Sequence, residues 1–390
     1  MRTVLVTGFA GAGRTAVAAA TARRDPSALL VTAEDVPGER VLRVDADAFL
    51  RRHLAALQER AAPVLEQLGA DPLEAEELTG LAGAQSLALL DAWHTARACG
   101  RYELLVVDLP PLPQALRLLA LPEELRRYLA RLLPPRRQAA RAALRPFLAQ
   151  LAGIPAPTAR LYAAAERWSA RLDGLRAAVE APGTTVRLVL EPGPRAVREL
   201  PALRARLALA GHTLDAVVAN RVLPDSADPW LAGLVHEQRR ALDELARQLP
   251  ESGPRLYEVP HLGPGEPAAL PVPDVPPAER PAEPWTVDDL LADEGVLRWR
   301  LPLPGARRGE LELVRRGEEL IVGLGPPGER YRRALRLPSA LRRCVIERAG
   351  LHDGELRVRF APDPALWPLP ARLPAQLSEH GAPQEVPSKA

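Results

Sequence analysis

A glycine-rich loop near the N-terminus places the tightest limit on how this chain folds. The loop, Gly8 to Thr15 (G-F-A-G-A-G-R-T), follows the apolar run Val4 to Val6 and leads into the alanine-rich stretch Ala16 to Ala22. Its spacing is that of a phosphate-binding loop, G-x-x-x-x-G-K-[ST], except that Arg14 stands in the lysine position. A strand, loop and helix in this order bind phosphate through backbone N–H groups at the helix N-terminus. The loop predicts an α/β domain whose nucleotide site is working, weakened or preserved only in shape.

Short apolar strands alternate with amphipathic helices through the first 260 or so residues. The predicted strands are Val4–Thr7, Ala28–Thr32, Val41–Val44, Leu104–Val107, Val186–Leu190, Ala216–Ala219 and Leu256–Val259. The predicted helices are Arg14–Arg23, Leu50–Leu68, Ala84–Ala98, Arg195–Ala210 and Trp230–Leu249. Strands that are apolar throughout indicate a parallel sheet covered on both faces.

A mostly helical stretch from Gln114 to Val179 interrupts this alternation. Prolines predict breaks in it at Pro122, Pro134-Pro135, Pro146 and Ile154–Pro157. The simplest interpretation is a helical insert, at about residues 114–180, inside an α/β domain that spans residues 1–262.

The chain changes character after residue 262. Residues 263–294 are rich in proline and predict a semi-rigid, exposed linker. Residues 295–361 hold six short strand candidates, which predict a small antiparallel sandwich: Val296–Leu301, Gly309–Val314, Glu319–Leu324, Tyr331–Leu337, Cys344–Glu347 and Leu356–Phe360. The polar, proline-rich tail at 362–390 predicts disorder.

Composition argues against several classes of protein. A formal net charge of +2 gives no concentrated basic surface for nucleic acid. No apolar run reaches the roughly 18 residues of a membrane-spanning helix, and no signal peptide is evident. Cys99 and Cys344 lie far apart, and the seven histidines are scattered, so we expect no zinc site and a cytoplasmic protein.

Two side chains complete a candidate magnesium site. Asp108 ends the strand L-L-V-V, where the carboxylate of a generic Walker B segment positions Mg²⁺ or its water; by itself, such an aspartate more often caps a turn. Thr15 supplies the hydroxyl that usually binds the ion in a phosphate loop. Arg14 keeps a positive charge but is too bulky and forked to lie along phosphates as lysine does. Because the only lysine of the chain is Lys389, the arginine also reflects a general preference for arginine.

Four segments, in order, resemble the ArsA-type arsenite-pump ATPases and the related ATPases that deliver tail-anchored membrane proteins. They are the loop, V-V-D-L-P-P-L-P-Q-A-L-R-L-L-A-L-P ending at Pro122, V-V-A-N-R-V-L-P with D-P-W (Val217 to Trp230), and the flanking V-R-L-V-L-E-P and Y-E-V-P-H-L. The resemblance covers about residues 1–270. It implies a P-loop NTPase fold of the deviant Walker A type, binding of ATP or ADP with Mg²⁺, and a homodimer. The implied nucleotide-binding residues are Gly8, Gly11, Ala12, Gly13, Arg14, Thr15, Asp108 and, for adenine, Asn220.

The chain departs from that family at the residues of hydrolysis. A lysine that reaches the partner's phosphates is Phe9 here, and Leu109 to Ala115 lack the hydroxyls and histidine of the family's switch. The aspartate near the attacking water is replaced by Glu34, with Asp35 adjacent as a substitute. Losing one charge donor costs ~10²-fold or more in rate, so several changes together predict weak or lost hydrolysis.

The segment from Tyr331 to Pro362 resembles α-crystallin-type, small-heat-shock domains, which are fused to some members of the same family. The ArsA-type resemblance implies a nucleotide-binding protein that handles a hydrophobic protein client through its leucine-rich helical insert. Leucines of the insert that simply pack on one another are an equally favoured interpretation. The alternatives are a nucleotide-independent scaffold or holdase, and an active ATPase that drives an anion pump. Without clustered cysteines for a soft metalloid, the last is the least favoured.

Overall fold

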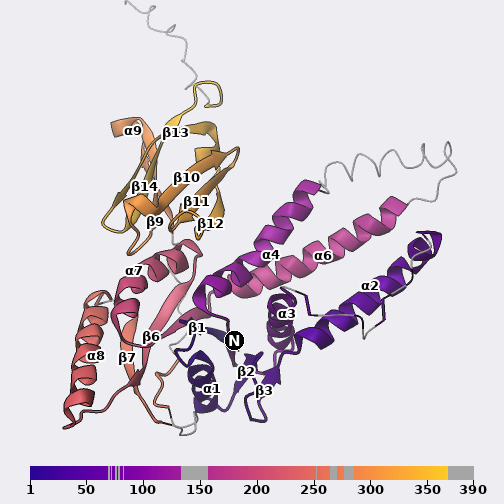
Figure 1. Ribbon diagram of the computed structural model, residues 1–390. Helices are drawn as coiled ribbons and strands as arrows, with labels where there is room; N and C mark the ends of the chain where they lie inside the picture. Colours follow the sequence, from indigo (N-terminus) through magenta and orange to yellow (C-terminus); the bar gives the residue numbers. More distant parts are fainter. Residues whose placement is uncertain are drawn as a thin grey trace, which may run out of the picture.

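A seven-stranded parallel sheet forms the centre of the N-terminal part (Figure 1). The computed structural model describes residues 1–68, 71, 73–74, 77, 80–81, 83–132, 157–251, 253–263, 270–275 and 285–367. The strand order is β3-β2-β4-β1-β5-β6-β7, and every neighbouring pair is parallel. The strands are β1 (Arg2–Gly8), β2 (Ala28–Thr32), β3 (Val41–Arg43), β4 (Leu104–Asp108), β5 (Thr184–Leu190), β6 (Thr213–Val222) and β7 (Arg255–Pro260).

Helices cover the two faces of this sheet unequally. One face packs against five of them: α3 (Ala84–Ala98), α4 (Leu112–Leu132), α6 (Pro157–Val179), α7 (Pro194–Leu209) and α8 (Pro229–Arg247). The other face packs against α1 (Arg14–Arg24) and against the segment Leu270–Val275, which we call the strap. The predicted parallel sheet and its covering helices are confirmed.

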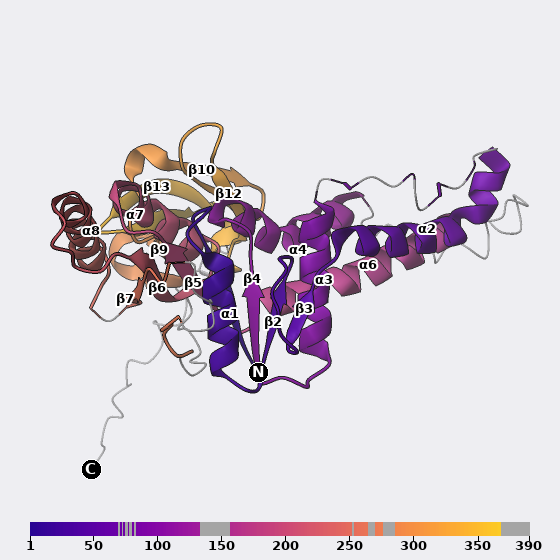
Figure 2. The same ribbon diagram turned by 60° about the horizontal axis from the view of Figure 1, so that its bottom comes forward.

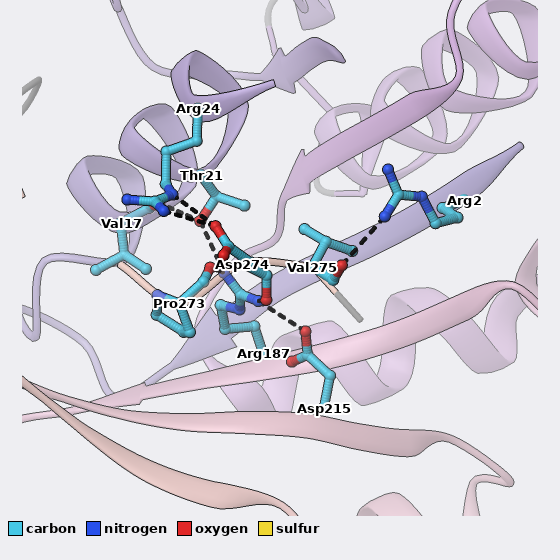
Figure 3. A network of polar contacts seen from close by, with 9 residues as sticks. All are labelled: Arg2, Val17, Thr21, Arg24, Arg187, Asp215, Pro273, Asp274 and Val275. Atoms are coloured by element: carbon cyan, nitrogen blue, oxygen red, sulfur yellow. Dashed lines mark hydrogen bonds and ion pairs between the residues drawn. The ribbon is translucent and has the colours of Figure 1, made fainter. Parts of the chain in front are cut away.

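The strap lies inside the region that its prolines predicted to be exposed. Val272 and Pro273 are buried instead, because the strap covers a sheet face that α1 leaves open. Arg187 of β5 holds it in place and donates to the carbonyl oxygens of Pro273 (2.9 Å) and Asp274 (3.1 Å), as Figure 3 shows. A second arginine, Arg2, donates to the carbonyl oxygen of Val275 at 3.1 Å.

Helices α4 and α6 form a long hairpin that projects from the sheet on the same side as α2 (Ala46–Leu68) (Figures 1 and 2). Pro122 lies within α4, so the break predicted there is wrong. Leu119 is buried and Leu125 packs on the same core, so tertiary packing offsets the hydrogen bond that proline removes. The breaks predicted at Pro134-Pro135, Pro146 and residues 154–156 lie outside the described residues, and Pro157 begins α6.

The C-terminal part is a sandwich of two antiparallel sheets, β10-β11-β12 and β13-β14-β9-β8. Its elements are β8 (Thr286–Leu290), α9 (Leu291–Glu294), β9 (Val296–Pro302), η3 (Arg308–Glu310), β10 (Leu311–Arg316), β11 (Glu319–Leu324), β12 (Tyr331–Arg336), η4 (Ala340–Arg343), β13 (Cys344–His352) and β14 (Glu355–Pro362). All six predicted strands occur. The additional strand β8 falls in the segment predicted to be linker, and the predicted tail is described only as far as Trp367.

The sandwich packs directly on α7 (Figure 1). Ala205 and Leu209 of α7 belong to its hydrophobic core, together with residues such as Trp299 and Phe360. Tyr331 of β12 packs on this core and on the core of the sheet domain. Helix α7 therefore contributes side chains to both cores.

Candidate functional site

The glycine-rich loop leaves β1 in close contact with the neighbouring strand β5. A Cβ atom at Gly8 would lie 1.7 Å from the carbonyl oxygen of Val189, and the Phe9 N–H donates to that oxygen at 3.0 Å. Gly11 and Gly13 adopt φ values of 80° and 84°, in the left-handed region that favours glycine. The loop thus has the backbone that turns a strand into the N-terminus of α1.

Asn220, at the end of β6, contacts this loop from the far side of β5. Its amide nitrogen Nδ2 donates to the carbonyl oxygen of Ala12 at 2.8 Å, and a Cβ atom at Gly13 would come within 2.3 Å of that nitrogen. The Asn220 side chain is buried. Only glycine at position 13 therefore lets Asn220 brace the loop.

Three residues meet where β1, β2 and β4 end. The hydroxyl Oγ1 of Thr15 donates to Asp108 Oδ2 at 2.7 Å, and the hydroxyl of Thr32 donates to the same oxygen at 2.9 Å. The other oxygen, Oδ1, is buried and has no hydrogen-bond partner among the described residues. Burial raises the pKa of Asp108, although both threonine hydrogen bonds and the charge of Arg14 lower it.

An orphaned carboxylate oxygen beside a threonine hydroxyl fits a magnesium ion. Mg²⁺ prefers oxygen ligands and is usually held by one or two protein groups while it keeps several waters. Its charge would also offset the cost of burying the Asp108 carboxylate. Thr15 and Asp108 are therefore the residues that would hold the ion.

The guanidinium of Arg14 turns toward the segment that follows β4. Its Nη1 donates to the carbonyl oxygen of Leu109, while Thr7 Oγ1 donates to the carbonyl oxygen of Pro110 at 2.7 Å. Leu109 and Leu112 are almost fully buried. The two leucines of the segment that replaces the family's hydroxyl-bearing switch thus pack into the core, and the cation of the loop is bound to its backbone.

Glu34 and Asp35, the candidate catalytic residues, are both exposed. The backbone N–H of Glu34 donates to Thr32 Oγ1 at 3.1 Å, and the Glu34 charge raises the pKa of Asp108. Asp35 instead pairs with Arg43 at 3.3 Å. Glu34 therefore lies near the candidate magnesium site, whereas Asp35 is engaged elsewhere.

The fold gathers the other predicted residues at the carboxyl edge of the sheet, where ligands bind in open α/β folds. One loop holds six of them: Gly8, Gly11, Ala12, Gly13, Arg14 and Thr15. Asp108 contacts this loop through Thr15, and Asn220 contacts it through Ala12. Sequence reasoning missed Thr32. Its signal was present, because a polar residue at the end of an apolar parallel strand reaches the same edge as Asp108.

A parallel sheet with a glycine loop at the start of α1, and with a buried threonine–aspartate pair behind that loop, defines a P-loop NTPase fold. A family model described as "Anion-transporting ATPase" matches residues 40–251, and one described as "HSP20-like domain found in ArsA" matches residues 294–360. The chain belongs to the ArsA-type anion-transporting ATPase family and carries an HSP20-like C-terminal domain.

Three relatives share most of the chain. An uncharacterized protein of Streptomyces coelicolor is 49% identical over 94% of this chain and 99% of its own length. A protein of Mycobacterium tuberculosis is 33% identical over 83% of this chain and 80% of its own length. A protein of Aquifex aeolicus, provisionally named arsenical pump-driving ATPase 1, is 23% identical over 92% of this chain and 99% of its own length.

Two further properties concern only the described residues. No helix among them is both long enough and apolar enough to span a bilayer. Nor do three or more histidine, cysteine, aspartate or glutamate side chains gather there into a candidate metal site.

Proposed function

We propose that this chain binds an adenine nucleotide with Mg²⁺ in the loop and hydrolyses it slowly or not at all. The observation that carries the proposal is the unpartnered Oδ1 of Asp108 beside Thr15. The backbone N–H groups from Gly11 to Thr15 would bind the phosphates, and Asn220 would lie near the adenine. Bound Mg²⁺ would neutralise phosphate charge.

Slow hydrolysis follows from what surrounds this binding site. Phosphoryl transfer depends on positioned cations and an oriented water. Here Arg14 donates to Leu109, the leucines that follow β4 are packed in the core, and Asp35 pairs with Arg43. Asp108 would bind the metal ion, and Glu34 is the remaining carboxylate that the described residues place near the site. Residual activity would therefore depend on orientation of a water by Glu34.

Calorimetric titration of the full chain with Mg-ADP and Mg-ATP, together with a phosphate-release assay, tests the proposal. We expect Thr15→Val to weaken Mg²⁺-dependent binding about tenfold or more, because it removes a hydroxyl bonded to a charged group. Thr3→Val is the matched control, since Thr3 is buried in β1 and its hydroxyl has no partner among the described residues. Robust turnover that Arg14→Ala abolishes would replace this proposal with an active ATPase.

The helical hairpin supports a second part of the proposal, the handling of a hydrophobic protein client. Tyr128 of α4 and Trp168 of α6 are half exposed, at 50% and 49%. Suppression of aggregation of a model client by the full chain, and its loss in Trp168→Glu, would support this role. Suppression that nucleotide leaves unchanged, in a chain that binds none, would instead identify a nucleotide-independent holdase.

We also propose that the chain is a homodimer, as the family resemblance implies. Light scattering after size-exclusion chromatography, with and without Mg-ADP, measures the mass directly. A single monomeric mass under both conditions would refute the dimer and leave the nucleotide site unaffected.

A further inference from the structure

An arginine from α7 rests on the aromatic ring of the phosphate loop. The guanidinium carbon of Arg195 lies 4.9 Å from the centroid of the Phe9 ring. Arg195 is the second residue of α7, which begins just beyond the carboxyl end of β5. Since Phe9 is the second residue of the loop, the contact places a cation from another element at the site.

Phe9 is a fixed platform for this cation. Its backbone N–H is bonded to Val189 of β5, and its partly buried ring packs against the hydrophobic clusters on both faces of the sheet. A guanidinium stacked on an aromatic face is held by cation–π attraction and stays less strongly hydrated than an ammonium. The ring thus limits where the Arg195 head group can lie.

The head group keeps donors for a ligand. Its Nε donates to Glu199 Oε1 at 3.1 Å, and no hydrogen bond within the described part of the chain engages its two terminal nitrogens. The Arg195 side chain is 62% exposed. Glu199 also pairs with Arg198 at 3.8 Å, so one carboxylate faces two guanidinium groups and the local charge remains positive.

Arg14 does not fill this role, because its guanidinium is bonded to the carbonyl oxygen of Leu109. A polyphosphate bound by backbone amides needs compensating positive charge beyond the metal ion. Arg195 is the arginine that stacks on the loop itself and has free terminal donors.

We propose that Arg195 binds the phosphate groups of the nucleotide and that Phe9 positions it by stacking. The inference rests on the proposed nucleotide binding and adds a residue to that site. It also assigns a function to the aromatic side chain in the loop. Phe9 stands where the family has a lysine, and it positions a cation from another element instead.

Calorimetric titration of the full-length protein with Mg-ATP, Mg-ADP and adenosine tests this assignment. We expect Arg195→Met to weaken binding of both nucleotides about tenfold or more and to leave adenosine binding within twofold, because only the phosphates contact Arg195. Arg198→Met is the matched control. It removes a 70% exposed arginine that pairs with the same glutamate, and it should change nucleotide affinity less than twofold.

The positioning role of Phe9 has its own test. Phe9→Leu keeps an apolar side chain but removes the ring, so it should weaken nucleotide binding while the thermal unfolding midpoint falls only slightly. The double variant Phe9→Leu/Arg195→Met should bind no worse than Arg195→Met, since the two residues act as one unit.

Three results would contradict the inference in distinguishable ways. Wild-type affinity in Arg195→Met would refute the phosphate contact while nucleotide binding stands. Additive losses in the double variant would refute positioning by Phe9. No nucleotide binding by the wild type would refute the proposed function and this inference together.

Discussion

Arg187 and Asp215 form an ion pair of 2.9 Å in the interior of the sheet domain, with side chains 0% and 1% exposed (Figure 3). Arg187 Nη1 also donates to Thr21 Oγ1 of α1 at 3.1 Å, and the same guanidinium holds the strap. Burial raises the pKa of Asp215, and the adjacent Arg187 charge lowers it. One arginine therefore joins β5, β6, α1 and the strap.

Arg187→Met should lower the free energy of unfolding by about 3–5 kcal/mol, because it leaves a buried carboxylate without its partner. Urea denaturation followed by circular dichroism measures the change. Arg24→Met is the control on the same strap. Its partner Asp274 is 83% exposed, so the loss should stay below about 1 kcal/mol. Equal losses in the two variants would show that the strap does not depend on the buried pair.

Gly305→Ala should loosen the sandwich from α7. The new Cβ atom would lie 2.5 Å from the carbonyl oxygen of Pro201, and the backbone already has a φ of 84°. Gly317→Ala is the matched control. Gly317 also has a positive φ, of 58°, but a Cβ atom added there would have no other atom within 4 Å. We expect Gly305→Ala to cost about 1–3 kcal/mol more than Gly317→Ala in the free energy of unfolding. Equal costs would mean that the loop moves away from α7 freely.

Asn220→Asp should destabilise the ligand-free loop by about 1–3 kcal/mol. A carboxylate oxygen would face the carbonyl oxygen of Ala12, where the native amide donates. Asn220→Ala removes the donor without adding a charge, so its cost should be smaller. Thermal unfolding without nucleotide compares the two. If the Asn220→Asp variant were more stable than the Asn220→Ala variant, Asn220 would not brace the loop.

Asp108→Asn should separate stability from binding. The raised pKa of Asp108 shows that burial disfavours its charge, so the neutral amide should leave the ligand-free protein at least as stable. The same change removes a magnesium ligand. We expect the thermal shift caused by Mg-ADP to disappear, while any shift caused by ADP alone persists. A normal Mg²⁺-dependent shift in Asp108→Asn would place the ion elsewhere.

Because of His212, the free energy of unfolding should fall in mild acid. Desolvation and then the charge of Arg333 lower its pKa to about 4 from the usual 6.5. The unfolded chain therefore binds more protons between these values, and stability should fall as the pH drops from about 6.5 to 4. His212→Gln should flatten that part of the pH profile, and His236→Gln, on the exposed side of α8, should not. An unchanged profile in His212→Gln would exclude His212 as the cause.

The central sheet could be predicted because each of its strands is identified by a short segment of the sequence alone. Apolar runs such as Leu104 to Val107 are uniformly buried, and the loop from Gly8 to Thr15 has one spacing that suits a phosphate. Asp108 and Asn220 could be placed at the same edge because parallel strands end together.

Other features depend on partners distant in sequence. The burial of Val272 depends on the part of a sheet face that α1 leaves open. Pro122 is tolerated because α4 packs along its length. An arginine within the apolar strand Thr184–Leu190 was the available signal for the strap. The contact of Arg195 with Phe9 gave no comparable signal, because the two residues lie 186 positions apart and meet only through the pairing of β1 with β5.

Because α7 contributes side chains to both cores, it limits how the chain can be shortened or rearranged. A protein that ended before Thr286 would leave Ala205 and Leu209 facing water on a helix that also covers the central sheet. The sandwich, separated from α7, would in turn lose one wall of its interior. Truncation between the two halves should therefore expose apolar surface on α7 and lower the solubility of the shortened protein.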